Sequence, residues 1–158
     1  GFVYLPGGYP ELYLAALSAN RQMLQSIRRY VESGGKLLAE CGGMMYLCDE
    51  IRDKNGDVYP MAGVLHQSAT MENMKLRLGY RTLLYNETRL KGHEFHYSRL
   101  VEQQNPLPSC AVAYTAKGVE TDTPLYHYKN VWAGYTHLYW ADPVGNEWFT
   151  KFVIDGNT

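Results

Sequence analysis

A cysteine followed by two glycines at the end of a short apolar run is the feature of this sequence with the clearest chemical potential. It lies in the segment Ala39-Glu40-Cys41-Gly42-Gly43. A nucleophile at a strand-to-helix turn projects from the sheet edge, and small neighbours allow the sharp turn and the approach of substrate. A following helix would favour the thiolate with its positive end. The alternative, a small buried hydrophobic residue, is common for free cysteines, but the flanking glycines favour a nucleophile.

A second glycine-rich loop, Pro6-Gly7-Gly8, ends an earlier apolar run. Such a loop can direct backbone N–H groups toward an oxyanion that forms on a thiol adduct. The alternative is a plain turn, because this tripeptide alone is weak evidence. Its value comes from its place one strand-helix-strand unit before Cys41.

A cysteine nucleophile needs a base, and His137 is the histidine best placed to act as one. It follows an apolar run directly, in the segment Gly134-Tyr135-Thr136-His137. Functional groups of parallel sheets gather at such strand ends. The alternative is a histidine that only fills the core or the surface. The remaining histidines are at positions 66, 93, 96 and 127.

The segment His93-Glu94-Phe95-His96 raises the question of a metal site. On a strand, however, residues three apart lie on opposite faces, so the two histidines would not meet at one ion. The sequence also lacks a CxxC or HExxH partner motif. We therefore expect no metal ligands in this chain.

The elements that must position these residues begin with strands at 2–5 and 36–40. Between them a helical region starts at Pro10, and Asn20 is placed to cap a second helix. A strand, a helix and a strand within about 40 residues predict parallel pairing. A helix from 44 to about 48 should follow the cysteine.

The rest of the chain alternates short apolar runs with turns. Strands are predicted near 61–65, 75–85, 92–97, 111–116 and 131–135, and a helix over 144–154. With no repeats, linkers or low-complexity segments, the sequence indicates one α/β domain.

Composition excludes several classes of function. A net charge of −1 over 158 residues offers no field for nucleic acid or anionic lipid, so we expect neither partner. No apolar run approaches the roughly 18 residues of a membrane span, and no signal peptide opens the chain. Three cysteines make a poor disulfide framework and suggest a reducing cytoplasm.

Four segments together resemble the glutaminase domain of cobyrinic acid a,c-diamide synthases: YLPGGYPEL, AECGGMMYL, GHEFHYS and GYTHLYW. That domain belongs to the triad-type, or class I, glutamine amidotransferases. The resemblance covers nearly the whole chain in the family's order. It implies a three-layer, mostly parallel, flavodoxin-like α/β fold, with residues 1–158 as one glutaminase domain that lacks its first strand and helix.

The resemblance also implies residue roles. Cys41 would be the nucleophile, His137 the base, and Gly8 with Gly42 the oxyanion donors, with Gly7 beside them. Ordinary class I enzymes orient the histidine with a glutamate two residues later, where this chain has Tyr139. Our expectation for the third group is Glu94.

The implied enzyme is larger than this chain. The family carries an ATP-binding domain with a phosphate loop upstream, and no GxxxxGK[ST] motif occurs here. We therefore expect a C-terminal fragment that binds glutamine and needs no cofactor itself. ATP, Mg²⁺ and the corrinoid substrate would bind to the N-terminal domain, and a homodimer is possible.

The implied activity is the release of ammonia from glutamine for amidation of the a and c carboxylates of cobyrinic acid. Three alternatives stay open at this point. They are the same role for another tetrapyrrole such as nickel-sirohydrochlorin, the glutaminase of a cobyric acid synthase, and a non-catalytic docking module. GHEFHYS disfavours the cobyric acid synthases, which differ there.

Overall fold

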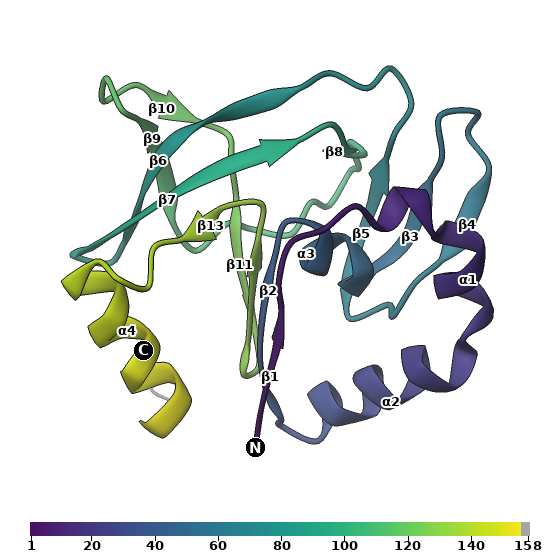
Figure 1. Ribbon diagram of the computed structural model, residues 1–158, viewed down its shortest axis with the longest axis horizontal. Coiled ribbons are helices and arrows are strands. Elements are labelled where there is room, and N and C mark those ends of the chain that lie inside the picture. Colours follow the sequence, from purple (N-terminus) through teal and green to yellow (C-terminus); the bar gives the residue numbers. More distant parts are fainter. Residues whose placement is uncertain (156–158) are drawn as a thin grey trace.

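The structure, a computed structural model, describes residues 1–155 of the chain (Figure 1). Its centre is a four-stranded sheet in the order β1-β2-β12-β11. The strands are β1 (Phe2–Leu5), β2 (Lys36–Glu40), β12 (Val131–Gly134) and β11 (Leu125–Tyr128). β1 and β12 both pair with β2 in parallel, and β11 pairs with β12 antiparallel. The predicted α/β fold with a mostly parallel sheet is confirmed.

Helices cover both faces of this sheet. Figure 1 shows α4 on one side and α1 with α2 on the other. After β1 the chain forms η1 (Pro10–Leu12), α1 (Leu14–Ala19) and α2 (Arg21–Glu32); later come α3 (Gly42–Leu47) and α4 (Pro143–Asp155). The predicted cap is present, since the Asn20 side chain accepts a hydrogen bond of 3.2 Å from the Met23 N–H. α3 begins two residues earlier than predicted, because the chain turns into it directly at Cys41.

Alternation along β2 divides the core into two clusters. Leu37 and Leu38 are both almost fully buried, but Leu37 packs with the cluster under α2 and α3, and Leu38 packs with Trp132 and Phe152 under α4. A central strand that is buried on both faces reads as a continuous apolar run, as LLA does here. β2 is therefore held between the two clusters, and Cys41 follows directly at its end.

Two further sheets flank the central one. The first has the order β10-β9-β6-β7-β13 with antiparallel pairs throughout, and the second has the order β4-β3-β5-β8, in which β3 and β5 are parallel. Their bounds are β10 (Glu120–Thr121), β9 (Val112–Thr115), β6 (Arg77–Tyr85), β7 (Thr88–His96), β13 (His137–Leu138), β4 (Val58–Pro60), β3 (Cys48–Arg52), β5 (Leu65–Thr70) and β8 (Arg99–Leu100).

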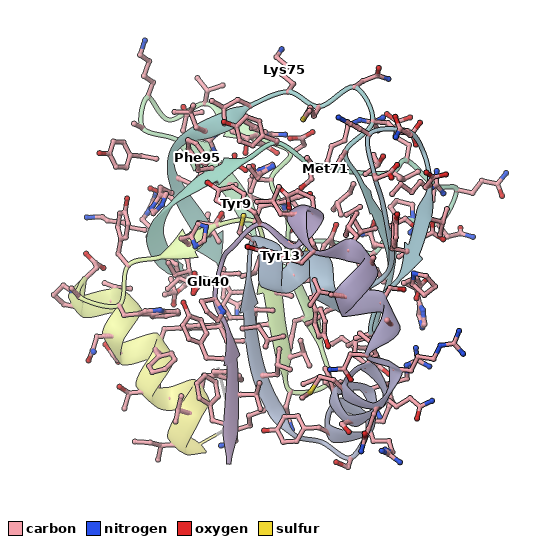
Figure 2. All side chains as sticks on the ribbon, turned by 45° about the vertical axis from the view of Figure 1, so that its right-hand side comes forward. Tyr9, Tyr13, Glu40, Met71, Lys75 and Phe95 are labelled. Atoms are coloured by element: carbon pink, nitrogen blue, oxygen red, sulfur yellow. The ribbon has the colours of Figure 1, made fainter. Side chains whose placement is uncertain are left out.

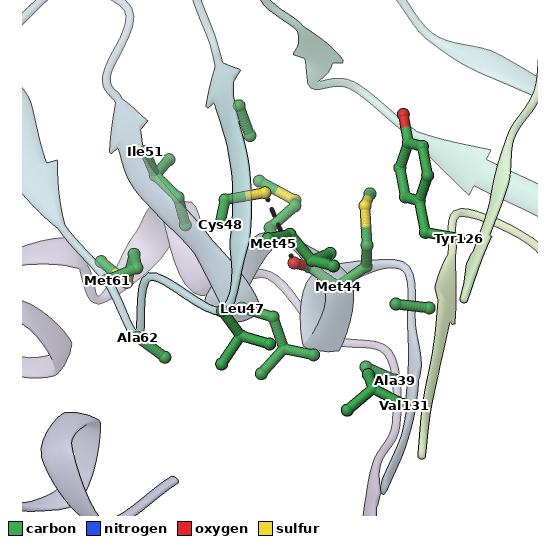
Figure 3. Packing of buried hydrophobic residues seen from close by; sticks show 14 of the residues in the cluster. Ala39, Met44, Met45, Leu47, Cys48, Ile51, Met61, Ala62, Tyr126 and Val131 are labelled. Carbon is green, nitrogen blue, oxygen red and sulfur yellow. Dashed lines mark hydrogen bonds between the residues drawn. The ribbon is translucent and has the colours of Figure 1, made fainter. Parts of the chain in front are cut away.

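The strand predicted near 61–65 is wrong in position, since β5 starts only at Leu65. β3 was not predicted; it begins at Cys48 as soon as α3 ends. Figure 3 shows Met44, Met45 and Leu47 of α3 packed in the core, and the Cys48 thiol donates to the Met44 carbonyl at 3.5 Å. Within residues 1–155, no helix is long and apolar enough to span a membrane.

Candidate active site

Cys41 forms the sharp turn between β2 and α3. Its backbone has φ 50° and ψ −110°, a conformation that non-glycine residues rarely adopt. The Cys41 N–H donates to the Gly134 carbonyl at 2.7 Å, and its carbonyl accepts from Met45 at 3.1 Å. Strain that the surrounding hydrogen bonds maintain is typical of functional positions. The predicted strand-to-helix turn is therefore present at the cysteine.

The two glycines after Cys41 let the turn pack against the chain that leaves β1. A Cβ atom at Gly42 would lie 2.6 Å from the Gly8 carbonyl oxygen, and one at Gly43 would lie 2.2 Å from the Leu5 carbonyl oxygen. Both distances are too short for any side chain. The structure thus brings the Pro6-Gly7-Gly8 loop directly to the cysteine turn, as the order of the strands predicts.

His137 stands over the same loop. A Cβ atom at Gly7 would lie 2.2 Å from His137 Cε1, so the imidazole fills the space above this glycine. On β7, His93 pairs with His137 in the strand register and stacks on its ring, with the centroids 5.1 Å apart. Burial lowers the pKa of His137 below its usual value of 6.5, and the neighbouring His93 and His96 lower it further. A neutral imidazole, able to accept a proton, is therefore favoured at neutral pH.

The Cys41 thiol is more enclosed than the sequence suggested. Cys41 is only 4% exposed, and its Sγ atom lies 3.5 Å from the Phe95 carbonyl oxygen of β7. Burial raises the pKa of Cys41 to about 11, the Gly42 N–H lowers it, and the nearby Glu11 raises it. The expectation that the thiolate is favoured is wrong, because burial raises the pKa of the thiol more than the Gly42 N–H lowers it. In the part of the chain that the structure describes, no hydrogen bond joins Sγ to His137.

Glu40, which the sequence analysis did not assign to the catalytic site, lies beside His137. It is 2% exposed, and Figure 2 shows it at the end of the central sheet below Phe95. Its Oε2 atom accepts a hydrogen bond of 2.9 Å from the Leu138 N–H and lies 3.9 Å from His137 Nδ1. One signal for it exists in the sequence: a charged residue ends the apolar run Leu37-Leu38-Ala39 immediately before the nucleophile.

The structure does not bring Glu94 to His137, which corrects the expectation for the third group. Glu94 is 1% exposed, and its carboxylate accepts hydrogen bonds from Arg81 at 2.6 Å and Thr123 at 2.7 Å and pairs with His96 at 2.8 Å. Burial raises the pKa of Glu94, but these partners together with Arg77 hold it at about 2. The reason is strand alternation on β7: His93 faces His137, so its neighbour Glu94 faces the other side.

The other predictions for the site concern the two histidines of β7, a metal ion and Tyr139. His93 and His96 lie on opposite faces of β7, one stacked on His137 and the other on Tyr135. Among residues 1–155, no three His, Cys, Asp or Glu side chains are grouped to hold a metal ion. Tyr139 packs against the His93 ring, with the centroids 5.6 Å apart. It therefore supports the neighbour of His137.

The fold of this chain matches that of a solved structure. A solved structure described as a glutamine amidotransferase superposes with a TM-score of 0.59, covering 96% of this chain and 78% of that chain. The two sequences are 18% identical, so this likeness shows the fold alone. The chain therefore has the same fold as that structure.

The sequence comparison then gives the family. Residues 1–144 match the CobB/CobQ-like glutamine amidotransferase domain, and the chain belongs to this family. It is 38% identical over 143 residues to a hydrogenobyrinate a,c-diamide synthase of Stutzerimonas stutzeri, covering 90% of this chain and 33% of the relative. It is also 38% identical over 145 residues to a cobyrinate a,c-diamide synthase of Fusobacterium nucleatum, covering 87% of this chain and 31% of the relative. The chain thus spans about a third of the length of these relatives. The predicted enzyme class, a glutamine amidotransferase, is confirmed.

Proposed function

We propose that this domain hydrolyses glutamine to glutamate and ammonia, with Cys41 as the nucleophile and His137 as the general base. The observation that carries the proposal is the meeting of three features at one end of the central sheet. The strained Cys41 turn is packed on the Pro6-Gly7-Gly8 loop, and His137 lies over Gly7 in the same loop. A nucleophile, a base and a loop of backbone donors are what acyl transfer from an amide requires.

The first half of the reaction begins with two neutral groups, because burial raises the pKa of Cys41 and lowers that of His137. As the sulfur attacks the side-chain amide carbon of glutamine, His137 accepts the thiol proton. The imidazolium then gives this proton to the departing nitrogen, and the C–N bond breaks. Ammonia leaves, and a glutamyl thioester remains on Cys41.

In the second half, His137 takes a proton from water while the water oxygen attacks the thioester carbon. The C–S bond breaks, glutamate leaves, and the sulfur regains the proton. In both halves a negative oxygen develops on the tetrahedral carbon. We propose that the backbone N–H groups of Gly8 and Gly42 stabilise it. In support, the Gly42 N–H already favours negative charge on the sulfur, and Gly8 lies directly against Gly42.

For the whole enzyme we propose that the ammonia amidates the a and c carboxylates of cobyrinic acid. The support is that the relatives are named cobyrinate or hydrogenobyrinate a,c-diamide synthases. These relatives are about three times as long as the matched region. We propose that ATP, Mg²⁺ and the corrinoid bind in the additional part, where ATP activates the carboxylate.

The test is glutamate release by the full-length protein and by two cysteine variants. Cys41→Ser should abolish turnover, because a serine hydroxyl lacks the nucleophilicity of the thiol. Cys110→Ser is the matched control: Cys110 is half-buried against the cluster under α4, and its variant should behave like the wild type. Normal glutamate release by Cys41→Ser would refute the proposal.

A further inference from the structure

Glu40 is a buried carboxylate beside the proposed catalytic residues that the mechanism above does not use. It is the last residue of β2 and precedes the nucleophile. Burying a carboxylate is costly unless hydrogen bonds compensate it. Tyr4 Oη donates to Oε1 at 2.8 Å, and the Leu138 N–H donates to Oε2 at 2.9 Å. These two donors come from β1 and β13, so they fix the carboxylate relative to both sides of the site.

The charge of this carboxylate has one basic neighbour. Among the described residues, the basic group within 4.0 Å of the Glu40 carboxylate is His137, whose Nδ1 lies 3.9 Å from Oε2. Glu94, the other buried glutamate nearby, is paired with both Arg77 and Arg81. Burial raises the pKa of the Glu40 carboxyl, and the hydrogen bonds from Tyr4 and the Leu138 N–H lower it. The charge of its ionised form is balanced by a cation at this distance only when His137 is protonated.

We infer that Glu40 positions His137 and stabilises the imidazolium that forms when His137 takes the thiol proton. The inference rests on the glutaminase function proposed above. In the resting site the 3.9 Å separation is longer than a hydrogen bond. Protonation strengthens the attraction, and a shift of about 1 Å would create a charge-assisted hydrogen bond. Because this bond engages Nδ1, it leaves Nε2 free for the thiol proton.

The effect of Glu40 on the protonation of His137 can be distinguished from the effects of the other nearby titratable groups. His93 from β7 stacks on His137, and Glu40 from β2 lies 3.9 Å from its Nδ1, whereas His96 lies on the opposite face of β7 and acts through its charge at longer range. Both histidines oppose protonation of His137, as burial does. A carboxylate 3.9 Å from Nδ1, as Glu40 is, favours protonation by its opposite charge. Removing the charge of Glu40 should therefore make His137 harder to protonate.

The experiment measures pH profiles of kcat and kcat/KM for glutamine hydrolysis by the full-length enzyme. Glu40→Gln keeps the shape of the side chain and an oxygen that can accept from the Leu138 N–H, but removes the charge. We expect kcat to fall by about 10²-fold or more, the range of acid–base groups, with KM nearly unchanged. The acid limb of kcat/KM should move to lower pH. Glu40→Asp keeps the charge, so its acid limb should stay near that of the wild type while kcat falls less.

The outcomes separate this inference from the function on which it rests. A loss of kcat in Glu40→Gln without any movement of the acid limb would mean a structural role and would overturn the inference. Wild-type kcat in Glu40→Gln, while Cys41→Ser is inactive, would overturn it as well. An active Cys41→Ser would instead overturn the proposed function. If Glu40→Gln does not fold, as judged by circular dichroism, Glu40→Asp decides: wild-type kcat with the shortened side chain would contradict a positioning role.

Discussion

Gly7→Ala should displace the catalytic base without straining the backbone. The added Cβ atom would lie 2.2 Å from His137 Cε1, whereas carbon atoms in contact are usually about 3.5–4.0 Å apart. The ring must therefore move by more than about 1 Å. Gly7 is not among the residues with positive φ, so its backbone conformation accepts alanine. A misplacement of about 1 Å can cost roughly 10²-fold in rate, and we expect kcat for glutamine hydrolysis to fall by about that factor.

Gly118→Ala is the matched control for this substitution. Gly118 has φ +79° and no atom within 4 Å of an added Cβ, so alanine there strains a turn but touches nothing. Its turnover should equal that of the wild type, although its stability falls by roughly 1 kcal/mol. The assay is glutamate release at saturating glutamine, with urea unfolding followed by tryptophan fluorescence. Wild-type turnover in a folded Gly7→Ala would refute the placement of His137 over the loop as a catalytic requirement.

The remaining predictions concern the base, the thiol and the cysteine turn. His137→Ala should lower kcat by about 10²–10⁴-fold, and His93→Ala, which removes only the stacked neighbour, should lower it less; the reverse order would contradict the choice of base. Iodoacetamide should react slowly with Cys41 near neutral pH, because burial raises the pKa of this thiol to about 11. A glutamine analogue with a diazoketone should modify Cys41 but not Cys48, which is fully buried. Peptide mapping by mass spectrometry measures both, and equal labelling of the two cysteines would contradict the assignment. Gly43→Ala should cost roughly 1–3 kcal/mol in urea unfolding because the added Cβ would lie 2.2 Å from a backbone oxygen of β1; unchanged stability would mean that this contact can relax.

Much of the fold follows from local sequence patterns. The apolar runs at β1 and β2, the cap at Asn20 and the parallel pairing of the first two strands were all predictable, since propensity, capping and connection length agree there. The prediction that Cys41 lies on a sharp turn depends on the same kind of local signal. The short strands after α3 were harder to place, because pairs such as β3 with β5 are decided by tertiary contacts.

The surroundings of Cys41 and His137 were less predictable because they depend on contacts between distant parts of the chain. The Phe95 carbonyl that covers the thiol lies 54 residues from Cys41, and the Leu138 N–H that holds Glu40 lies 98 residues away. No local sequence pattern predicts contacts between residues so far apart in the chain. Glu94 was assigned to the wrong role for a related reason. The sequence places it in the GHEFHYS segment, but which face of β7 lies toward His137 depends on how β13 pairs with β7.

A covalent glutamyl thioester on Cys41 is the most direct consequence of the proposed chemistry. Full-length enzyme would be mixed with glutamine, quenched in acid within its first turnovers, digested and mapped by mass spectrometry. We expect a glutamyl adduct on the peptide that contains Cys41, absent from the Cys41→Ser variant and from samples without glutamine. Steady release of glutamate with no adduct at Cys41, or with an adduct on another residue, would contradict it.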